Sequence, residues 1–130
     1  MYSKAPGGVS WIDLTVDNAA EIKDFYAKVV GLDSMGQSMA DGAYEDYVMT
    51  TAEDPEFAVG ICHAKGPNQE MPPQWLMYFN VSDVELALQE CVKMGGTVIK
   101  PMTDMGSFEM GVIKDPAGAV AGVIKAKAET

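Results

Sequence analysis

Hydrophobic and polar positions follow two periods along the chain, and each period occurs twice. Apolar residues recur at every second position in 11–16 (WIDLTV) and 76–81 (LMYFNV), as in a strand with one buried face. In the segment that follows each of these strands, apolar residues recur at three- and four-residue spacing, as in an amphipathic helix. Turn signals then separate short strand-like runs, predicted at 33–39, 44–51 and 57–64 in the first half and at 97–101, 107–114 and 119–126 in the second.

The two halves are a weak internal repeat with an offset of 65 residues. Val16 aligns with Val81, and Gly31 aligns with Gly96. Each half therefore reads as strand, helix and three strands, and we expect an α+β fold of two βαβββ modules forming curved mixed sheets around a cleft, with the helices outside. The predicted organisation is a single domain over 1–130, with module one at about 9–64, a linker at 65–73 and module two at about 74–127.

Both predicted helices carry start signals and a core stripe. Asn18 with Glu21, and Ser82 with Glu85, fit the spacing of a capping box. The apolar stripes are predicted to face the core. They consist of Ile22, Phe25, Tyr26, Val29 and Val30 in the first helix and of Val84, Ala87, Leu88 and Cys91 in the second.

Side-chain alternation divides the first strand of each module into two faces. Ile12, Leu14 and Val16 should face the helix in module one, as should Met77, Phe79 and Val81 in module two. The opposite face mixes aromatic, charged and polar groups, which is typical of a pocket wall; a solvent-exposed face is the alternative. Its residues are Trp11, Asp13 and Thr15, then Leu76, Tyr78 and Asn80.

Gly122 lies inside a predicted strand, where glycine is unfavourable because it packs no side chain and loses much backbone entropy. Two explanations are open. Either another group approaches the backbone closely there, or a functional side chain has been lost.

The chain resembles the vicinal oxygen chelate superfamily, which includes glyoxalase I, bleomycin-resistance proteins and extradiol dioxygenases. The resemblance lies in IDLTVDN…DFY…VVGL, in YFNVSDV…MGG and in the closing VIKDPAGAVAGV. It implies two curved half-sheets with helices outside and a ligand pocket on the concave face.

Metal-bearing members of that family take ligands from four strand positions, which match Trp11, Gly60, Leu76 and Gly122 here. None of these side chains can coordinate a divalent cation. We therefore expect no metal and no cofactor. A displaced site built from Asp13, His63 and another acid is the alternative.

Charge and composition exclude several classes of partner. The net charge is −10 and the chain contains nine lysines and no arginine, so we expect neither nucleic-acid nor anionic-membrane binding. Cys62 and Cys91 lack metal-site spacing and are expected to be buried thiols. The N-terminus has no apolar signal segment, which indicates a cytoplasmic protein.

Three residues are candidates for acid–base chemistry. Asp13 has apolar neighbours on its predicted face, and such surroundings disfavour its charged form. Tyr78 is its repeat partner, and His63 is the only histidine in the chain. The alternative is that Asp13 is a buried structural carboxylate and that His63 is a packed residue.

These features predict a metal-independent, glyoxalase-like protein that binds a modest apolar or aromatic ligand. The expected ligand-binding residues are Trp11, Asp13, Gly60, Leu76, Tyr78, Asn80 and Gly122. The alternative is a lyase or isomerase-type enzyme that uses Asp13, with Tyr78 or His63, for proton transfer. We also expect a homodimer, and a cleft that serves mainly dimer contact is a third possibility.

Overall fold

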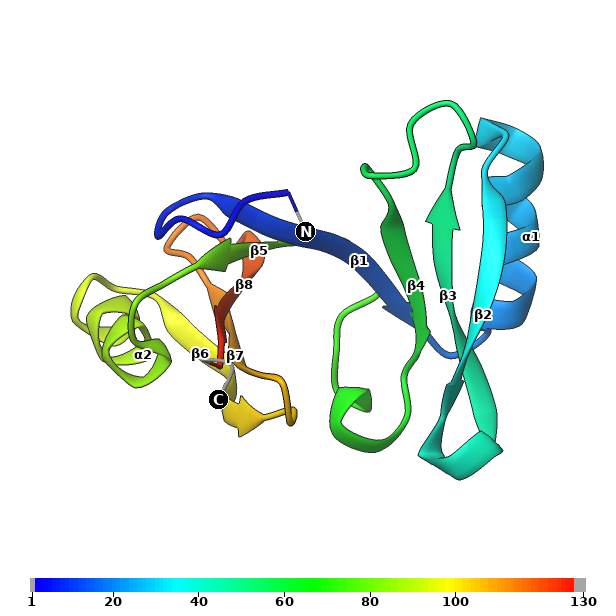
Figure 1. The fold of residues 1–130 in the computed structure, drawn as a ribbon. Coiled ribbons are helices and arrows are strands. Elements are labelled where there is room, and N and C mark those ends of the chain that lie inside the picture. Colours follow the sequence, from blue (N-terminus) through cyan, green and yellow to red (C-terminus); the bar gives the residue numbers. More distant parts are fainter. Residues whose placement is uncertain (1, 128–130) are drawn as a thin grey trace. The chain divides into compact units, whose positions relative to one another are not determined.

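The computed structural model describes residues 2–127, and its elements follow the predicted order. The first half contains β1 (Val9–Val16), α1 (Ala19–Val30), β2 (Asp33–Met39), β3 (Tyr44–Thr50) and β4 (Val59–His63). The second half contains β5 (Trp75–Asn80), α2 (Val84–Lys93), β6 (Thr97–Asp104), β7 (Phe108–Lys114) and β8 (Val120–Ala126). The α+β class and the two βαβββ modules are therefore confirmed (Figure 1).

The chain divides into two compact units. One is Ile12–Trp75, and the other comprises the described residues of 1–11 and 76–130. The N-terminal segment therefore belongs with module two. Main-chain hydrogen bonds hold it to the end of β5, from Gly7 N to Asn80 O at 2.7 Å and from Asn80 N to Gly8 O at 2.9 Å. The Asn80 side-chain amide also donates to Ser3 O at 2.7 Å.

In the unit Ile12–Trp75 the strand order is β2-β3-β4-β1. β1 and β4 are parallel, and the other neighbours are antiparallel. Helix α1 runs alongside the sheet (Figure 1). The core beneath it is the fully buried cluster of Ala19, Met49 and Ile61. Val16 and Tyr26 pack against this cluster, so Val16 faces the helix as the alternation predicts.

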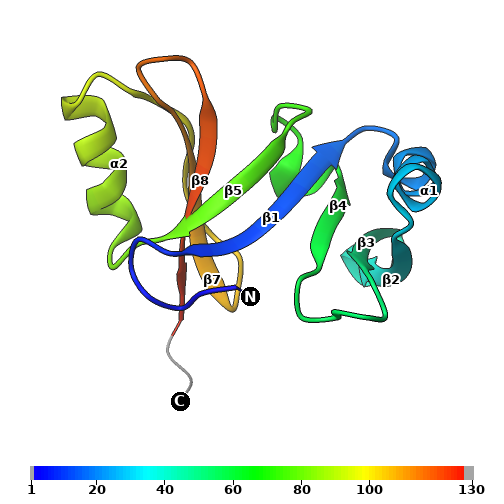
Figure 2. The same ribbon diagram turned by 90° about the horizontal axis from the view of Figure 1, so that it is seen from above.

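In the second unit the strand order is β5-β8-β7-β6, with β5 parallel to β8. Helix α2 packs against β6, β7 and β8, and Figure 2 shows it beside β8. Val84, Leu88 and Val123 form the buried cluster there, and Val81 packs against it. The helix-facing position predicted for Val81 is therefore confirmed.

Helix α1 differs from the prediction. Ile22 and Tyr26 pack on the core, but Phe25, Val29 and Val30 are 53–64% exposed. The apolar stripe of this helix is wider than the surface that its own sheet covers. Within residues 2–127, neither helix is long and apolar enough to cross a membrane.

The start of α2 also differs from the prediction. The N-cap is Asp83 and not Ser82, and its carboxylate accepts a hydrogen bond from Leu86 N at 3.0 Å. A carboxylate and a hydroxyl are both good N-caps. The sequence alone therefore does not show which of the adjacent residues Ser82 and Asp83 caps the helix. Because Asp83 caps the helix, the Ser82 hydroxyl is not used for this purpose.

Candidate functional site

Gly122 has a direct structural explanation. It pairs with Tyr78 across the parallel β5–β8 ladder, and the Tyr78 ring lies over its α-carbon. A Cβ added at Gly122 would overlap the ring, with Cγ of Tyr78 only 2.9 Å away. Tyr78 itself is 5% exposed. Of the two explanations of Gly122, the structure supports the close approach of another group, because the Tyr78 ring occupies the space over this glycine.

The other metal-equivalent positions are also occupied by packed or donor-free residues. Leu76 is 1% exposed in β5. The ring of Trp11 lies 6.2 Å from the ring of Tyr2, centroid to centroid. Gly60 is buried in β4. These side chains offer no oxygen, sulfur or imidazole nitrogen, so they do not fit the divalent ion of metal-bearing relatives.

Asp13 lies in the other unit, opposite Gly60 in the parallel β1–β4 ladder. It is half-buried, and Asp46 in neighbouring β3 is 5% exposed. Cys62 follows two residues after Gly60 in β4, and burial raises the pKa of its thiol, with further contributions from Asp13 and Asp46. The Cys62 thiol is therefore protonated at neutral pH. Cys62 and Cys91 are both free and half-buried, so they are less buried than the sequence predicts.

His63 ends β4, and its imidazole is held in place by its surroundings. Nδ1 lies 2.8 Å from the carbonyl oxygen of Glu45. A carbonyl only accepts, so Nδ1 carries the proton in this arrangement. The imidazole also contacts the rings of Tyr44 and Tyr47, whose centroids are 5.5 and 6.1 Å away. Asp46 Oδ1 accepts from His63 N at 2.8 Å and lies 3.5 Å from Nδ1.

Asp13 and His63 are not brought together. His63 pairs with Val16, three residues along β1 from Asp13, which is roughly 10 Å at the rise of a strand. Within residues 2–127, no three His, Cys, Asp or Glu side chains are grouped so that they could hold a metal ion. The alternative metal site of Asp13, His63 and another acid therefore has no geometric support.

A groove of about 1220 Å³ lies within the second unit, at the ends of β5 and β8. Of the residues predicted to bind ligand, Asn80 lines it. Its apolar part is formed by Pro6, Val81, Phe108, Ile124 and Ala126, and its polar part by Ser10, Ser82, Ser107 and three lysines, Lys4, Lys125 and Lys127. The assignment of Trp11, Asp13, Gly60, Leu76, Tyr78 and Gly122 to one ligand cleft stays a prediction.

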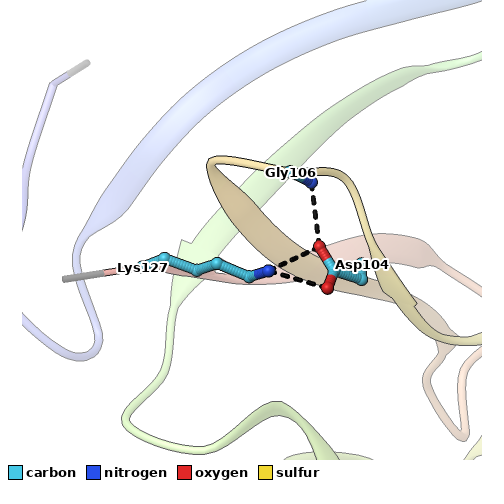
Figure 3. Close-up of polar contacts among 3 residues, drawn as sticks. All are labelled: Asp104, Gly106 and Lys127. Carbon is cyan, nitrogen blue, oxygen red and sulfur yellow. Dashed lines mark hydrogen bonds and ion pairs between the residues drawn. The ribbon is translucent and has the colours of Figure 1, made fainter. Parts of the chain in front are cut away.

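One side of this groove is held by Asp104 (Figure 3). Both carboxylate oxygens of Asp104 lie 2.7 Å from Lys127 Nζ, and Oδ1 also accepts from Gly106 N at 2.9 Å. Lys127 N donates to Ser107 O at 3.0 Å. Hydrogen bonds from Lys127 and Gly106 lower the pKa of Asp104. These contacts fix the β6–β7 turn and so place Ser107 and Phe108 beside the end of β8.

Little in the amino-acid sequence predicts this groove. Its residues come from the N-terminal segment, the end of β5, the β6–β7 turn and the end of β8, which are far apart along the chain. The available signal was the pair of lysines after the last apolar residues of the final strand, Lys125 and Lys127, which carries no meaning until the fold places the other segments.

The fold is that of α+β proteins built from two βαβββ modules. The family model of the Glyoxalase/Bleomycin resistance protein/Dioxygenase superfamily matches residues 8–121. The chain therefore belongs to this superfamily, as the resemblance indicates.

Among its relatives is the Mycobacterium tuberculosis protein named "Putative glyoxylase CFP32", which is 31% identical over 121 residues. The alignment covers 92% of this chain and 46% of the relative. The anthracycline biosynthesis protein DnrV of Streptomyces peucetius is 26% identical, with 92% and 42% covered. The chain thus spans less than half the length of these curated relatives.

Solved structures show the same fold at low identity. A glyoxalase/bleomycin resistance protein/dioxygenase superfamily member from Vibrio splendidus 12B01 has a TM-score of 0.59 at 11% identity, with 91% of this chain and 99% of that chain covered. Methylmalonyl-CoA epimerase from Mycobacterium tuberculosis has a TM-score of 0.58 at 10% identity, with 98% and 93% covered. At this low sequence identity, the two similarities show the fold alone.

The packing of Tyr78 on Gly122 can be tested by substitution. We expect Gly122→Ala to lower the free energy of unfolding by about 1–3 kcal/mol, as overpacking does, measured by urea denaturation. The matched control is Gly36→Ala in β2, where the added methyl would meet only the carboxylate end of exposed Glu45, which can move away. Equal effects of the two substitutions would contradict the packing.

Proposed function

We propose that this chain is a metal-independent, glyoxalase-like protein that binds a small molecule with a modest apolar or aromatic body. The observation that carries the proposal is the groove of about 1220 Å³ at the ends of β5 and β8. It combines apolar side chains, including Phe108 and Ile124, with hydroxyl and ammonium groups such as those of Ser107 and Lys125. Such a combination is typical of small-ligand sites. A cytoplasmic location is part of the same proposal.

Metal independence is supported by the residues at the family's ligand positions. Tyr78 covers Gly122, and Leu76 is buried. A Lewis-acid step through the family's metal would need donor atoms that these side chains lack. In this proposal the face of β5 that carries Leu76 and Tyr78 serves packing, and the groove binds the ligand.

Binding in the groove can be tested with a neutral aromatic probe, N-phenyl-1-naphthylamine, by fluorescence titration. We expect binding that is unchanged by EDTA and that is weakened at least threefold by Phe108→Ala, because truncation removes apolar contact area. Phe57→Ala is the control, since Phe57 is exposed and outside the groove. Loss of binding on chelation, or equal effects of the two variants, would refute the proposal.

The alternative is a lyase or isomerase-type enzyme with Asp13 as acid or base. The specific observation in its favour is that half-buried Asp13 lies next to buried groups, near enough to Cys62 to raise the pKa of its thiol. His63 is anchored by Glu45 and Asp46, so it acts in this alternative only if its Nε2 meets the substrate.

The substitution Asp13→Asn distinguishes a binding protein from an enzyme that uses Asp13. If the chain is a binding protein, the substitution leaves ligand affinity within about twofold, and no turnover is lost because none exists. An enzyme that uses Asp13 would lose turnover far more than affinity. Screening of co-purified small molecules by native mass spectrometry provides the ligand for this comparison. A large fall in turnover would establish the enzyme in place of the binding protein.

We also infer that two copies associate through α1. Its Phe25, Val29 and Val30 are exposed, and exposed apolar side chains gathered on one helix are typical of an interface.

We expect a dimer by analytical ultracentrifugation and a monomer for Val29→Glu/Val30→Glu. The control is Val92→Glu on α2, which changes an equally exposed valine elsewhere. A wild-type monomer at all concentrations would contradict the inference.

A further inference from the structure

Positive charge is concentrated around the groove of the second unit. Three of the nine lysines of the chain line it: Lys4, Lys125 and Lys127. None of its described lining residues is an Asp or a Glu, although the chain contains 19 acids and has a net charge of −10. A site that is cationic against this acidic background favours a ligand of opposite charge.

The three lysines are not equivalent. Lys127 is held by both oxygens of Asp104 at 2.7 Å (Figure 3). Lys125 lies opposite Glu109 in the β7–β8 ladder, but Glu109 does not line the groove. Lys4 enters from the N-terminal segment and is exposed. Lys127 and Lys125 thus each have an acid beside them, Asp104 and Glu109, and Lys4 and Lys125 are the two groove lysines outside the Asp104 contact.

Hydroxyl groups stand beside these cations. Ser82 lines the groove and is not the N-cap of α2, because Asp83 takes that position. Ser107 lies on the β6–β7 turn, which Asp104 and Lys127 hold in place. Each hydroxyl has one O–H that can donate a hydrogen bond to an anion. Phe108 and Ile124 supply apolar surface next to them.

We propose that the groove binds an organic acid: a small molecule with an apolar body and one anionic group. This deepens the proposed function and rests on it. The anionic group lies against Lys4 and Lys125, with the serine hydroxyls as donors. The apolar body lies against Phe108 and Ile124. Asp104 binds Lys127 and thereby limits the charge that the groove offers to the anion.

The experiment uses two probes that share one aromatic body. 8-Anilino-1-naphthalenesulfonate carries a sulfonate, and N-phenyl-1-naphthylamine is its neutral counterpart. Fluorescence titrations at low ionic strength should give tighter binding of the anionic probe, with the difference reduced by added salt. Amide shifts of Ser107, Phe108 and Lys127 in a nitrogen–proton correlation spectrum should locate both probes in the groove.

Variants at exposed lysines separate local from overall charge. Lys4→Gln and Lys125→Gln should each lower the affinity for the anionic probe roughly two- to fivefold, the range of an exposed ion pair. The affinity for the neutral probe should not change. Lys114→Gln has the same effect on net charge but lies outside the groove, and it should change neither. Asp104→Asn should tighten the anionic probe, because it releases Lys127 while the amide oxygen still accepts from Gly106 N.

The outcomes distinguish this inference from the proposed function. If neither probe binds, the proposed function fails and this inference fails with it. If both probes bind equally well and the lysine variants have no effect, the proposed function stands and the organic-acid inference is wrong. If Lys114→Gln weakens the anionic probe as much as Lys4→Gln does, the charge acts over the whole surface and the groove is not the site.

Discussion

The packing of the Tyr78 ring over Gly122 is the contact on which the rest of this account depends. It joins β5 to β8 and occupies the space over Gly122, the position that the family resemblance matches to a metal ligand. A side chain at residue 122 and a ring at residue 78 cannot both occupy this space. Because interiors are close-packed, the ring leaves no room for a larger side chain at residue 122.

The packing of Tyr78 over Gly122 also bears on where a ligand can bind. With Tyr78 and Leu76 buried, the inner face contributes to stability, and the groove at the ends of β5 and β8 offers accessible polar and apolar groups. The Asp104 contacts to Lys127 and Gly106 shape that groove. The fold thus keeps the family's framework, while the chemistry that we propose for it depends on lysines and hydroxyls and not on a bound ion.

Much of the fold was predictable because it depends on local patterns. Period-two and helical spacing gave the order of elements, and alternation gave the helix-facing positions of Val16 and Val81. The exposure of Val29 was missed because periodicity does not reveal how much of an apolar stripe the sheet covers. Gly122 was identified as unusual, but its partner depended on the register of β5 with β8, which is a long-range property. The lysines of the groove were missed for the same reason.

The most direct measurement is the nuclear Overhauser effect between the Tyr78 ring protons and the α-protons of Gly122. The account predicts a strong effect, together with an upfield ring-current shift of the Gly122 α-protons that disappears in Tyr78→Leu. Gly122 α-protons at ordinary strand shifts, with no effect from the Tyr78 ring, would show that the space over Gly122 is open. That result would contradict the account and return this position to the candidate ligand site.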